Sequence, residues 1–374
     1  MAGVYIHIPF CKKACHYCDF HFSTSLQNKD LMVDAICKEI DARQNYLTDK
    51  KLSTIYFGGG TPSLLNYDEL SRIISKIKEH FEIMPGAEVT LEANPDDLTV
   101  EKIKELTAAG INRLSIGIQS FFDEDLERMN RSHTANQAID AVENAKSGGI
   151  NNISIDLIYG LPNLTIEKWN YNLEQAFKLD VQHLSAYCLT IEEKTAFNHF
   201  LKKGKITLPK EPETIEQFEL LMSEAEKHNF IHYEISNFSK EGLYSKHNCS
   251  YWMNEHYMGI GPSAHSFDGA SRQFNIANNM KYIKGINAGI PDFEIEILTD
   301  ENKFNEYIMT RLRTMWGIST SFISDSFGEK SRNTFLSVAE PYVISGHLQW
   351  KQDSLVLTKS GKLLADKIAS DLFV

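Results

Sequence analysis

Three of the six cysteines crowd into eight residues near the N-terminus, at Cys11, Cys15 and Cys18. Thiolates are soft ligands that suit zinc and iron–sulfur clusters. Structural zinc normally takes four protein ligands, often from two Cys-x2-Cys pairs, and this chain has one such pair. His16 or His21 could complete a zinc site, and Cys15 with Cys18 alone would fit a redox dithiol. The redox interpretation leaves Cys11 without a role, whereas a cluster uses all three thiolates.

Three thiolates have a particular consequence for a [4Fe–4S] cluster, because they leave one of its four irons without a protein ligand. Such an open iron can bind a small molecule and pass it an electron. The Cys-x3-Cys-x2-Cys spacing, with Tyr17 before the last cysteine, resembles the signature of the radical SAM superfamily. In that family the open iron binds S-adenosylmethionine (SAM), whose sulfonium is cleaved when the cluster is reduced. The resemblance therefore implies two cofactors, a [4Fe–4S] cluster and SAM.

The elements that position this loop can be predicted from the hydrophobic pattern. Short β-rich runs alternate with longer amphipathic segments, which implies parallel strands joined by right-handed helical crossovers. The predicted strands cover residues 4–8, 54–57, 88–93, 113–118, 152–158, 183–187 and 231–235. The predicted helices cover residues 30–47, 68–80, 100–109, 136–147, 166–179 and 215–227. Chemistry in such folds lies at the carboxyl ends of the strands, and the cysteine loop follows the first one.

This alternation fits a doubly wound sheet, a full TIM barrel or an incomplete barrel. The alternation does not choose among them, and from the resemblance to the radical SAM superfamily we expect the third, an α/β fold with a partial (β/α)6 TIM-like barrel of parallel strands over residues 1–240. Residues 241–298 form a further segment, rich in glycine and aromatic side chains. Residues 299–374 are predicted as a smaller, winged-helix-like helical module at the C-terminus, with a helical cap and hairpin as the alternative. Its helices are expected at 302–314, 332–345 and 360–372, and its strands at 348–350 and 355–357.

Six further motifs occur in order along residues 1–240, mostly after predicted strands. They lie at Tyr5–Cys11, Gly58–Pro62, Glu92–Pro95, Ser115–Phe121, Arg131–His133 and Asp156–Pro162. Together they resemble the oxygen-independent coproporphyrinogen III oxidase family of the radical SAM superfamily. The resemblance implies that the residues that contact SAM are Tyr5, Tyr17, Gly60, Thr61, Glu92, Gln119, Arg131, Asp156 and Thr190.

The chemistry of these side chains agrees with that role. Asp156 at a strand end can accept hydrogen bonds from both ribose hydroxyls, and Arg131 can pair with the SAM carboxylate. Gly60 and Thr61 belong to a loop that holds the methionine ammonium group in the family. Taken singly, each could be an ordinary turn or packing residue. The ordered set is what indicates SAM binding.

Two features depart from the oxidases. Those enzymes carry a further cysteine two residues after the third, where this chain has Phe20. They also carry an N-terminal extension, and this sequence begins four residues before Tyr5. Both departures point away from the oxidase branch of the family.

Residues 247–252 match the HNxxYW motif of the radical SAM haem chaperones. The resemblance implies that haem is bound by His247, Tyr251 and Trp252. An imidazole can ligate iron, and aromatic rings can flank a porphyrin. The alternative for all three is ordinary packing. His265, in the glycine-rich stretch that follows, is either a second ligand or structural.

The leading hypothesis is a radical SAM protein that binds haem and delivers it to apo-haemoproteins, with the cluster and SAM supporting binding, dimerisation or transfer. The alternative is an enzyme, an oxygen-independent coproporphyrinogen III oxidase that decarboxylates propionates. A third hypothesis, from a different class, is a zinc-bearing interaction protein whose glycine loops bind nothing. Whether the chain is an enzyme stays open on the sequence.

Composition narrows the choice of partners. The formal net charge of −12 argues against nucleic-acid binding, although a local basic patch would allow peripheral membrane contact. The start of the chain has no signal-peptide pattern, and no apolar stretch is long enough to span a bilayer. We therefore expect a cytoplasmic protein, monomeric or homodimeric, that receives electrons from a separate donor.

Overall fold

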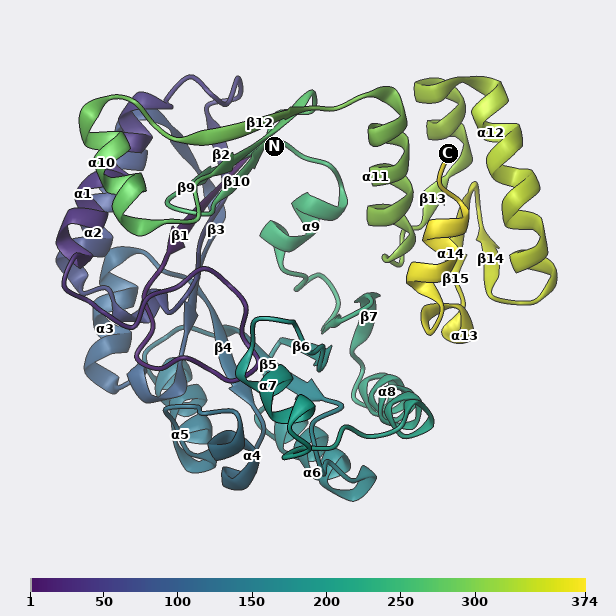
Figure 1. The fold of residues 1–374 in the computed structure, drawn as a ribbon, viewed down its shortest axis with the longest axis horizontal. Helices are drawn as coiled ribbons and strands as arrows, with labels where there is room; N and C mark the ends of the chain where they lie inside the picture. The colour runs from purple at the N-terminus through teal and green to yellow at the C-terminus, as the bar shows by residue number, and fades with distance from the viewer. Residues whose placement is uncertain (1) are drawn as a thin grey trace.

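Six parallel strands stand side by side in chain order in this computed structural model, which describes residues 2–374 (Figure 1). The strands are β1 (Ala2–Ile8), β2 (Lys51–Gly59), β3 (Glu82–Ala93), β4 (Arg113–Gln119), β5 (Asn152–Tyr159) and β6 (His183–Cys188). The helices between them are α1 (Lys29–Ala42), α2 (Tyr67–His80), α3 (Val100–Ala109), α4 (Asp123–Arg128), α5 (Ala135–Ser147) and α6 (Ile166–Lys178). Each strand pairs in parallel with the next. The predicted partial (β/α)6 barrel is confirmed.

Side-chain alternation within a strand separates the hydrophobic core from the barrel interior. In β5, Ile153, Ile155 and Leu157 are fully buried in the main hydrophobic core. Ser154 and Asp156 alternate with them and therefore point to the opposite face, inside the barrel. This arrangement places polar side chains where the strands converge.

Local signals fix the ends of several helices as the sequence indicates. α2 begins at a capping box, in which Asn66 and Glu69 each accept a backbone N–H of the other, at 2.9 and 2.8 Å. α3 ends at Gly110, whose φ of 97° closes the last turn in a left-handed conformation. The helices predicted at 68–80 and 100–109 are therefore found almost unchanged.

The strand predicted at residues 231–235 is present, but it does not run parallel to the others. After α7 (Ala196–Lys202) and α8 (Glu211–Lys227), β7 (Ile231–Glu234) forms a hairpin with β8 (Asn237–Ser239), and β8 pairs antiparallel with β6. Only two residues join β7 to β8, which is too short for a parallel crossover. The prediction of a further parallel strand is wrong at this edge.

The segment after residue 240 adds strands at the other edge of the sheet. Following α9 (Lys246–Trp252), β9 (Tyr257–Ile260) pairs in parallel with β1. Strands β10 (His265–Phe267), β11 (Ser271–Asn275) and β12 (Phe293–Ile297) continue the sheet antiparallel, with α10 (Asn279–Ala288) before the last. The sheet has twelve strands, in the order β12-β11-β10-β9-β1-β2-β3-β4-β5-β6-β8-β7. Residues 257–297 therefore extend the barrel sheet.

The C-terminal residues form a second unit with its own hydrophobic core. Its elements are α11 (Asp300–Leu312), β13 (Ile318–Ser319), α12 (Thr320–Ile344), β14 (Leu348–Lys351), β15 (Ser354–Leu357), α13 (Lys359–Lys362) and α14 (Ala365–Asp371). Gly328, with φ 87°, breaks α12 into two helical pieces. The resulting order of helix, strand, two helices and a two-stranded wing is that of a winged helix.

Two boundaries in this unit differ from expectation. Helical structure begins at Thr320 and not near residue 332, because Ser319 caps a helix ahead of the Gly328 kink. The last predicted helix, 360–372, is divided between α13 and α14.

No helix among residues 2–374 is both long enough and apolar enough to span a membrane.

The C-terminal unit is held against the barrel at β7. The Met315 N–H donates to the Tyr233 carbonyl at 2.9 Å, and Arg313 lies 3.4 Å from Glu234. Figure 1 shows α11 facing α9, which lies between the barrel and this unit. One side of α11 consequently borders the open end of the barrel.

A buried carboxylate joins α1 to the strands added after residue 240. Glu39 is 2% exposed and accepts hydrogen bonds from the Tyr282 hydroxyl at 2.5 Å and the Asn275 amide at 2.7 Å. It also accepts from the Gly261 N–H at 2.9 Å and from Arg43 at 3.1 Å. Since Gly261, Asn275 and Tyr282 all lie more than 200 residues further along the chain, Glu39 ties the β9–β12 extension to α1.

Replacement of Glu39 by alanine is expected to destabilise this junction, because several buried donors would lose their acceptor. Breaking a buried, hydrogen-bonded ionic network costs on the order of 3 kcal/mol or more. Thermal unfolding followed by circular dichroism should show a lowered midpoint for Glu39→Ala and a smaller loss for Glu39→Gln. Glu101→Ala, at an exposed position of α3, serves as the control. Equal midpoints for the Glu39 and Glu101 variants would contradict the assigned role.

Candidate functional site

The cysteine loop follows β1 and is closed by backbone hydrogen bonds. The Ser23 N–H donates to the Pro9 carbonyl at 2.8 Å, and the Cys11 N–H donates to the Ser23 carbonyl at 3.0 Å. Cys11, Cys15 and Cys18 are all free thiols of intermediate burial. Burial raises the pKa of the Cys11 thiol and raises that of Cys18 to about 11, and the charge of Cys15 adds to both shifts. The three thiols therefore lie near one another.

The spacing of the three sulfur atoms distinguishes between metals. A tetrahedral zinc site, with Zn–S bonds of about 2.3 Å, holds its sulfurs only about 3.8 Å apart. Among residues 2–374, the three thiols do not form a group whose ligand atoms all lie within 4.8 Å of one another. The loop is therefore spread more widely than zinc requires, and a larger iron–sulfur cluster fits the donor set better.

The glycine loop after β2 packs directly on the backbone that leads into the cysteine loop. The Gly60 N–H donates to the Ile8 carbonyl at 2.9 Å, and the Thr61 N–H donates to the Phe10 carbonyl at 2.7 Å. A Cβ atom at Gly60 would lie 2.6 Å from the Phe10 carbonyl oxygen, so a larger residue cannot be accommodated there. The Thr61 hydroxyl contacts the Cys11 thiol. The predicted SAM residues Gly60 and Thr61 thus lie beside the first cysteine.

Two carboxylates occupy the barrel interior next to this loop. Glu92 accepts from the Tyr56 hydroxyl at 2.8 Å and from the Gly59 N–H at 3.1 Å, whereas Asp156 accepts from the Ser115 hydroxyl at 3.4 Å. Burial raises the pKa of Glu92 to about 7, with a contribution from the charge of Asp156. Burial also raises the pKa of Asp156 to about 6. Because these two buried carboxylates accept few hydrogen bonds, they are suited to bind a cation or hydroxyl donors.

Arg131 links the cysteine loop to the ends of β3 and β4. Its Nη2 donates to the Gly117 carbonyl at 2.6 Å and to Asn94 Oδ1 at 2.8 Å. Its Nη1 lies 3.4 Å from both the Cys15 sulfur and the Tyr17 hydroxyl, and its buried Nε has no hydrogen-bond partner. The structure thus brings Arg131 and Tyr17 together with the cysteines.

Gln119, Tyr5 and Thr190 complete the set predicted to contact SAM. Gln119 is buried at the end of β4 with φ 72°, a conformation that a non-glycine residue adopts at some cost and that is frequent at functional sites. The Tyr5 hydroxyl lies 3.1 Å from His7 Nδ1. Thr190 follows β6 and is exposed.

Of the three residues predicted to bind haem, His247 and Tyr251 lie together, whereas Trp252 does not join them. His247 is 1% exposed and sits inside the barrel, with Nδ1 2.8 Å from the Thr54 hydroxyl and Nε2 2.8 Å from the Tyr251 hydroxyl. Its ring stacks on Tyr56 at 4.9 Å, and burial lowers its pKa to about 3. Trp252 lies apart, with the Arg313 guanidinium 5.9 Å from its ring centre. Tyr251 is the member of the motif that reaches a cleft.

That cleft has a volume of about 580 Å³ and opens beside the cysteine loop. The cysteine loop contributes Phe20 and His21 to it, and the barrel contributes Tyr5 and Glu92. Its remaining walls come from α9, the α9–β9 connection, β9–β11 and α11, with Tyr251, Asn254, Glu255, Tyr257, Ser263, His265, Phe267, Arg272 and Thr310. The volume lies within the range of cofactor-binding sites.

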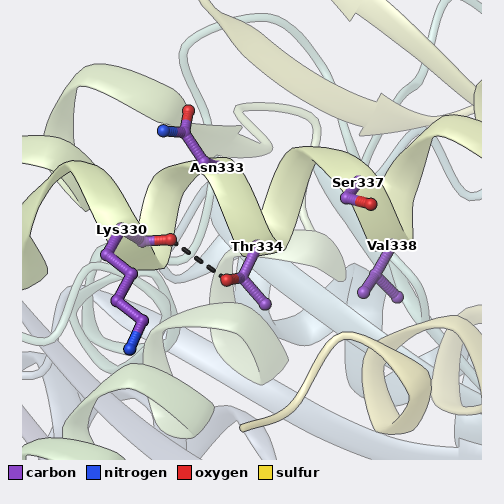
Figure 2. Close-up of a pocket in the computed structure, with 5 residues that line it drawn as sticks. All are labelled: Lys330, Asn333, Thr334, Ser337 and Val338. Carbon is purple, nitrogen blue, oxygen red and sulfur yellow. Dashed lines mark hydrogen bonds between the residues drawn. The ribbon is translucent and has the colours of Figure 1, made fainter.

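A second hollow, of about 610 Å³, lies along α12 in the C-terminal unit (Figure 2). It is lined by Lys330, Asn333, Thr334, Ser337 and Val338, which all come from one helix. The Thr334 hydroxyl donates to the Lys330 carbonyl at 3.1 Å, as in many helices. The lining has no thiol, imidazole or carboxylate, so this hollow assembles no chemistry.

Several residues of the site and of the cleft are not indicated by the sequence. Arg272 lies on β11, a strand that the hydrophobic pattern does not indicate, and the sequence suggests Asn94 only as part of a motif. Tyr56 holds Glu92, yet its position inside an apolar run suggests only packing. A signal that could have indicated Tyr56 is its alternation with the apolar residues of β2, which places it on the interior face.

Comparison with known families accounts for both units of the structure. A family model described as the radical SAM superfamily matches residues 5–176, and one described as the HemN C-terminal domain matches residues 298–364. Among solved structures, coproporphyrinogen III oxidase (HemN) from Escherichia coli superposes with a TM-score of 0.86 at 23% identity. The superposition covers 100% of this chain and 90% of that one, which establishes the shared fold.

Curated relatives match along nearly the whole chain. A protein from Bacillus subtilis named heme chaperone HemW is 36% identical over 371 residues, which is 98% of each chain. A protein of the same name from Mycobacterium tuberculosis is 31% identical and covers 99% of this chain and 94% of its own. On these relatives, the chain belongs to the radical SAM superfamily and, within it, to the family of proteins named heme chaperone HemW.

Proposed function

We propose that this protein binds haem in the cleft beside its cysteine loop and delivers the haem to apo-haemoproteins, with a [4Fe–4S] cluster and SAM bound next to it. The observation that carries the proposal is the cleft itself, which joins the loop at Phe20 to a wall of aromatic, histidine and arginine side chains. Such a wall suits a large, flat, apolar ring with charged edges. The names of the relatives support the same cargo.

The chain's own residues fit the two cofactors. Cys11, Cys15 and Cys18 would hold the cluster, and their thiols would lose protons on binding it. Arg131, with its unpartnered Nε, and the carboxylates of Glu92 and Asp156 would hold the charged and hydroxyl groups of SAM. When bound, the cluster and SAM supply one-electron chemistry that no side chain here can supply.

The oxidase alternative is less well supported. Phe20 stands where the oxidases carry a further cysteine, and its ring is 69% exposed at the cleft. An apolar ring there can contact a bound porphyrin but cannot donate a thiol or a hydrogen atom from sulfur. The likeness to the solved oxidase reaches only 23% identity and thus concerns the fold.

The remaining expectations complete the proposal. Delivery requires an apo-haemoprotein as client, and reduction of the cluster requires an electron donor. We further propose a cytoplasmic location, which is supported by the six free thiols, since reducing compartments keep cysteines unpaired. The overall negative charge supports protein clients over nucleic acid.

Anaerobic reconstitution with iron and sulfide should give about four irons per chain and a brown chromophore. Cys11→Ala, Cys15→Ala and Cys18→Ala should each lose most of this iron, because each removes one of three ligands. Cys37→Ala, in α1, is the matched control and should keep it. Stoichiometric zinc without iron in the wild-type chain would exclude the cluster.

SAM affinity should depend on pH through the interior carboxylates. Burial raises the pKa of Asp156 to about 6, so its charged form is lost as the pH falls through that value. Lowering the pH from 7 to 5 should therefore weaken SAM binding about tenfold. Asp156→Asn should bind weakly at both pH values, whereas Asp140→Asn, at an exposed position of α5, should behave as wild type. Equilibrium dialysis with labelled SAM measures both effects, and a flat wild-type profile would contradict the role of Asp156.

Haem titration should give saturable absorbance changes near one equivalent per chain, and the loaded protein should pass its haem to apomyoglobin. The chain should not convert coproporphyrinogen III when SAM and a reductant are supplied, because Phe20 replaces the further cysteine of the oxidases. Product analysis by chromatography tests this. Conversion to a divinyl product would overturn the chaperone proposal in favour of the oxidase.

A further inference from the structure

His265, at the start of β10, presents a free imidazole to the cleft. Its side chain is exposed, and its ring packs edge-to-face on Phe274 at 4.7 Å. Among residues 2–374, neither ring nitrogen of His265 makes a hydrogen bond. Burial lowers its pKa below the ordinary value, with a contribution from the charge of Arg272. The ring is therefore neutral near pH 7 and has a lone pair available for a metal.

The other cleft histidines are already engaged. His7 lies 3.1 Å from the Tyr5 hydroxyl through Nδ1 and 3.0 Å from the His21 carbonyl through Nε2. His21 uses its Nε2, which lies 2.7 Å from Asn279 Oδ1. His247 is not part of the cleft wall, and both of its nitrogens are hydrogen-bonded. Of the histidines on this wall, His265 alone offers both nitrogens.

Arg272, on the neighbouring strand β11, supplies a matching cation. Its Nη2 lies 3.0 Å from Glu306, while its buried Nε has no hydrogen-bond partner. A buried guanidinium N–H without an acceptor is costly, and a carboxylate in the cleft would satisfy it with a charge-assisted bond. The Arg272 guanidinium also lies 5.8 Å from the ring centre of Phe267, which helps to fix its position.

We propose that His265 is the protein ligand to the iron of haem bound in this cleft, and that Arg272 pairs with one haem propionate. This inference rests on the proposed function, because it concerns the same cargo. Ligation transfers no electrons: an imidazole nitrogen of His265 displaces a water from the iron. Tyr257 and Phe267 line the same wall and offer aromatic surface to the porphyrin.

The motif residue His247 takes a different role under this proposal. To reach iron, it would have to break two hydrogen bonds of 2.8 Å and leave its stack on Tyr56. Its bond to the Tyr251 hydroxyl instead holds Tyr251 in the cleft wall. His247 is accordingly a positioning residue, which acts on haem through Tyr251.

Ferric haem titrations of the full-length, cluster-loaded protein test the assignment by absorption and electron paramagnetic resonance. His265→Ala and His265→Gln should lose the signature of histidine ligation and bind haem at least tenfold more weakly, and free imidazole should restore the signature to the alanine variant. His247→Ala should keep histidine ligation, as should His228→Ala, an exposed control at the C-terminal end of α8. Iron content and circular dichroism confirm that each variant is folded.

The proposed pairing of Arg272 with a propionate is tested by comparing the binding of haem with that of haem dimethyl ester. Arg272→Gln should weaken binding of haem but leave binding of the ester unchanged, because only haem carries free propionates. Unaltered spectra in both His265 variants, or loss of histidine ligation in His247→Ala alone, would overturn the assignment. Failure of the wild-type chain to bind haem would instead refute the proposed function, so the two failures are distinguishable.

Discussion

β1 is paired in parallel on both of its edges, with β2 on one side and β9 on the other, and the rest of the site depends on this double pairing. The β2 register brings Gly59 opposite Ile8, so that the glycine loop closes over the backbone that leads to the cysteines. The β9 register brings Ile260 opposite Ile6, so that the chain turns into β10 and His265 on the other side of the same loop. The carboxyl end of β1 thereby borders both the cysteine loop and the side of the cleft that carries His265.

The barrel interior is built in two layers below that loop. Tyr5, Tyr56 and Glu92 form the upper layer, in which the two tyrosine rings stack 6.1 Å apart and Tyr56 donates to Glu92. His247 lies beneath, stacked on both tyrosines and bonded to Thr54. α9 therefore fills the lower half of the incomplete barrel with its own side chain. In the upper layer, Tyr5 and Glu92 also line the cleft.

The sequence was sufficient for features that depend on local signals. The six parallel strands, the capped α2 and the cysteine loop all follow from patterns within about ten residues, and the structure has them as predicted. β9–β12 could not be predicted, because such short strands gain stability only from pairing with partners far away in the chain. The burial of His247 could not be predicted for the same reason, since its partner Thr54 lies 193 residues away. A motif identifies residue types, but the direction in which each side chain points is set by tertiary contacts.

The cleft has three kinds of wall. The cysteine loop and the barrel supply two of the walls, and α11 of the C-terminal unit supplies part of the third through Thr310. This unit contacts the barrel at β7, through the bond of Met315 to Tyr233, and it contacts β11 through the ion pair of Glu306 with Arg272 at 3.0 Å. Glu39 in turn ties the β9–β11 wall, which carries His265 and Arg272, to α1. Under the proposed function, His265 and Arg272 on this sheet would hold haem in a defined position next to the C-terminal unit.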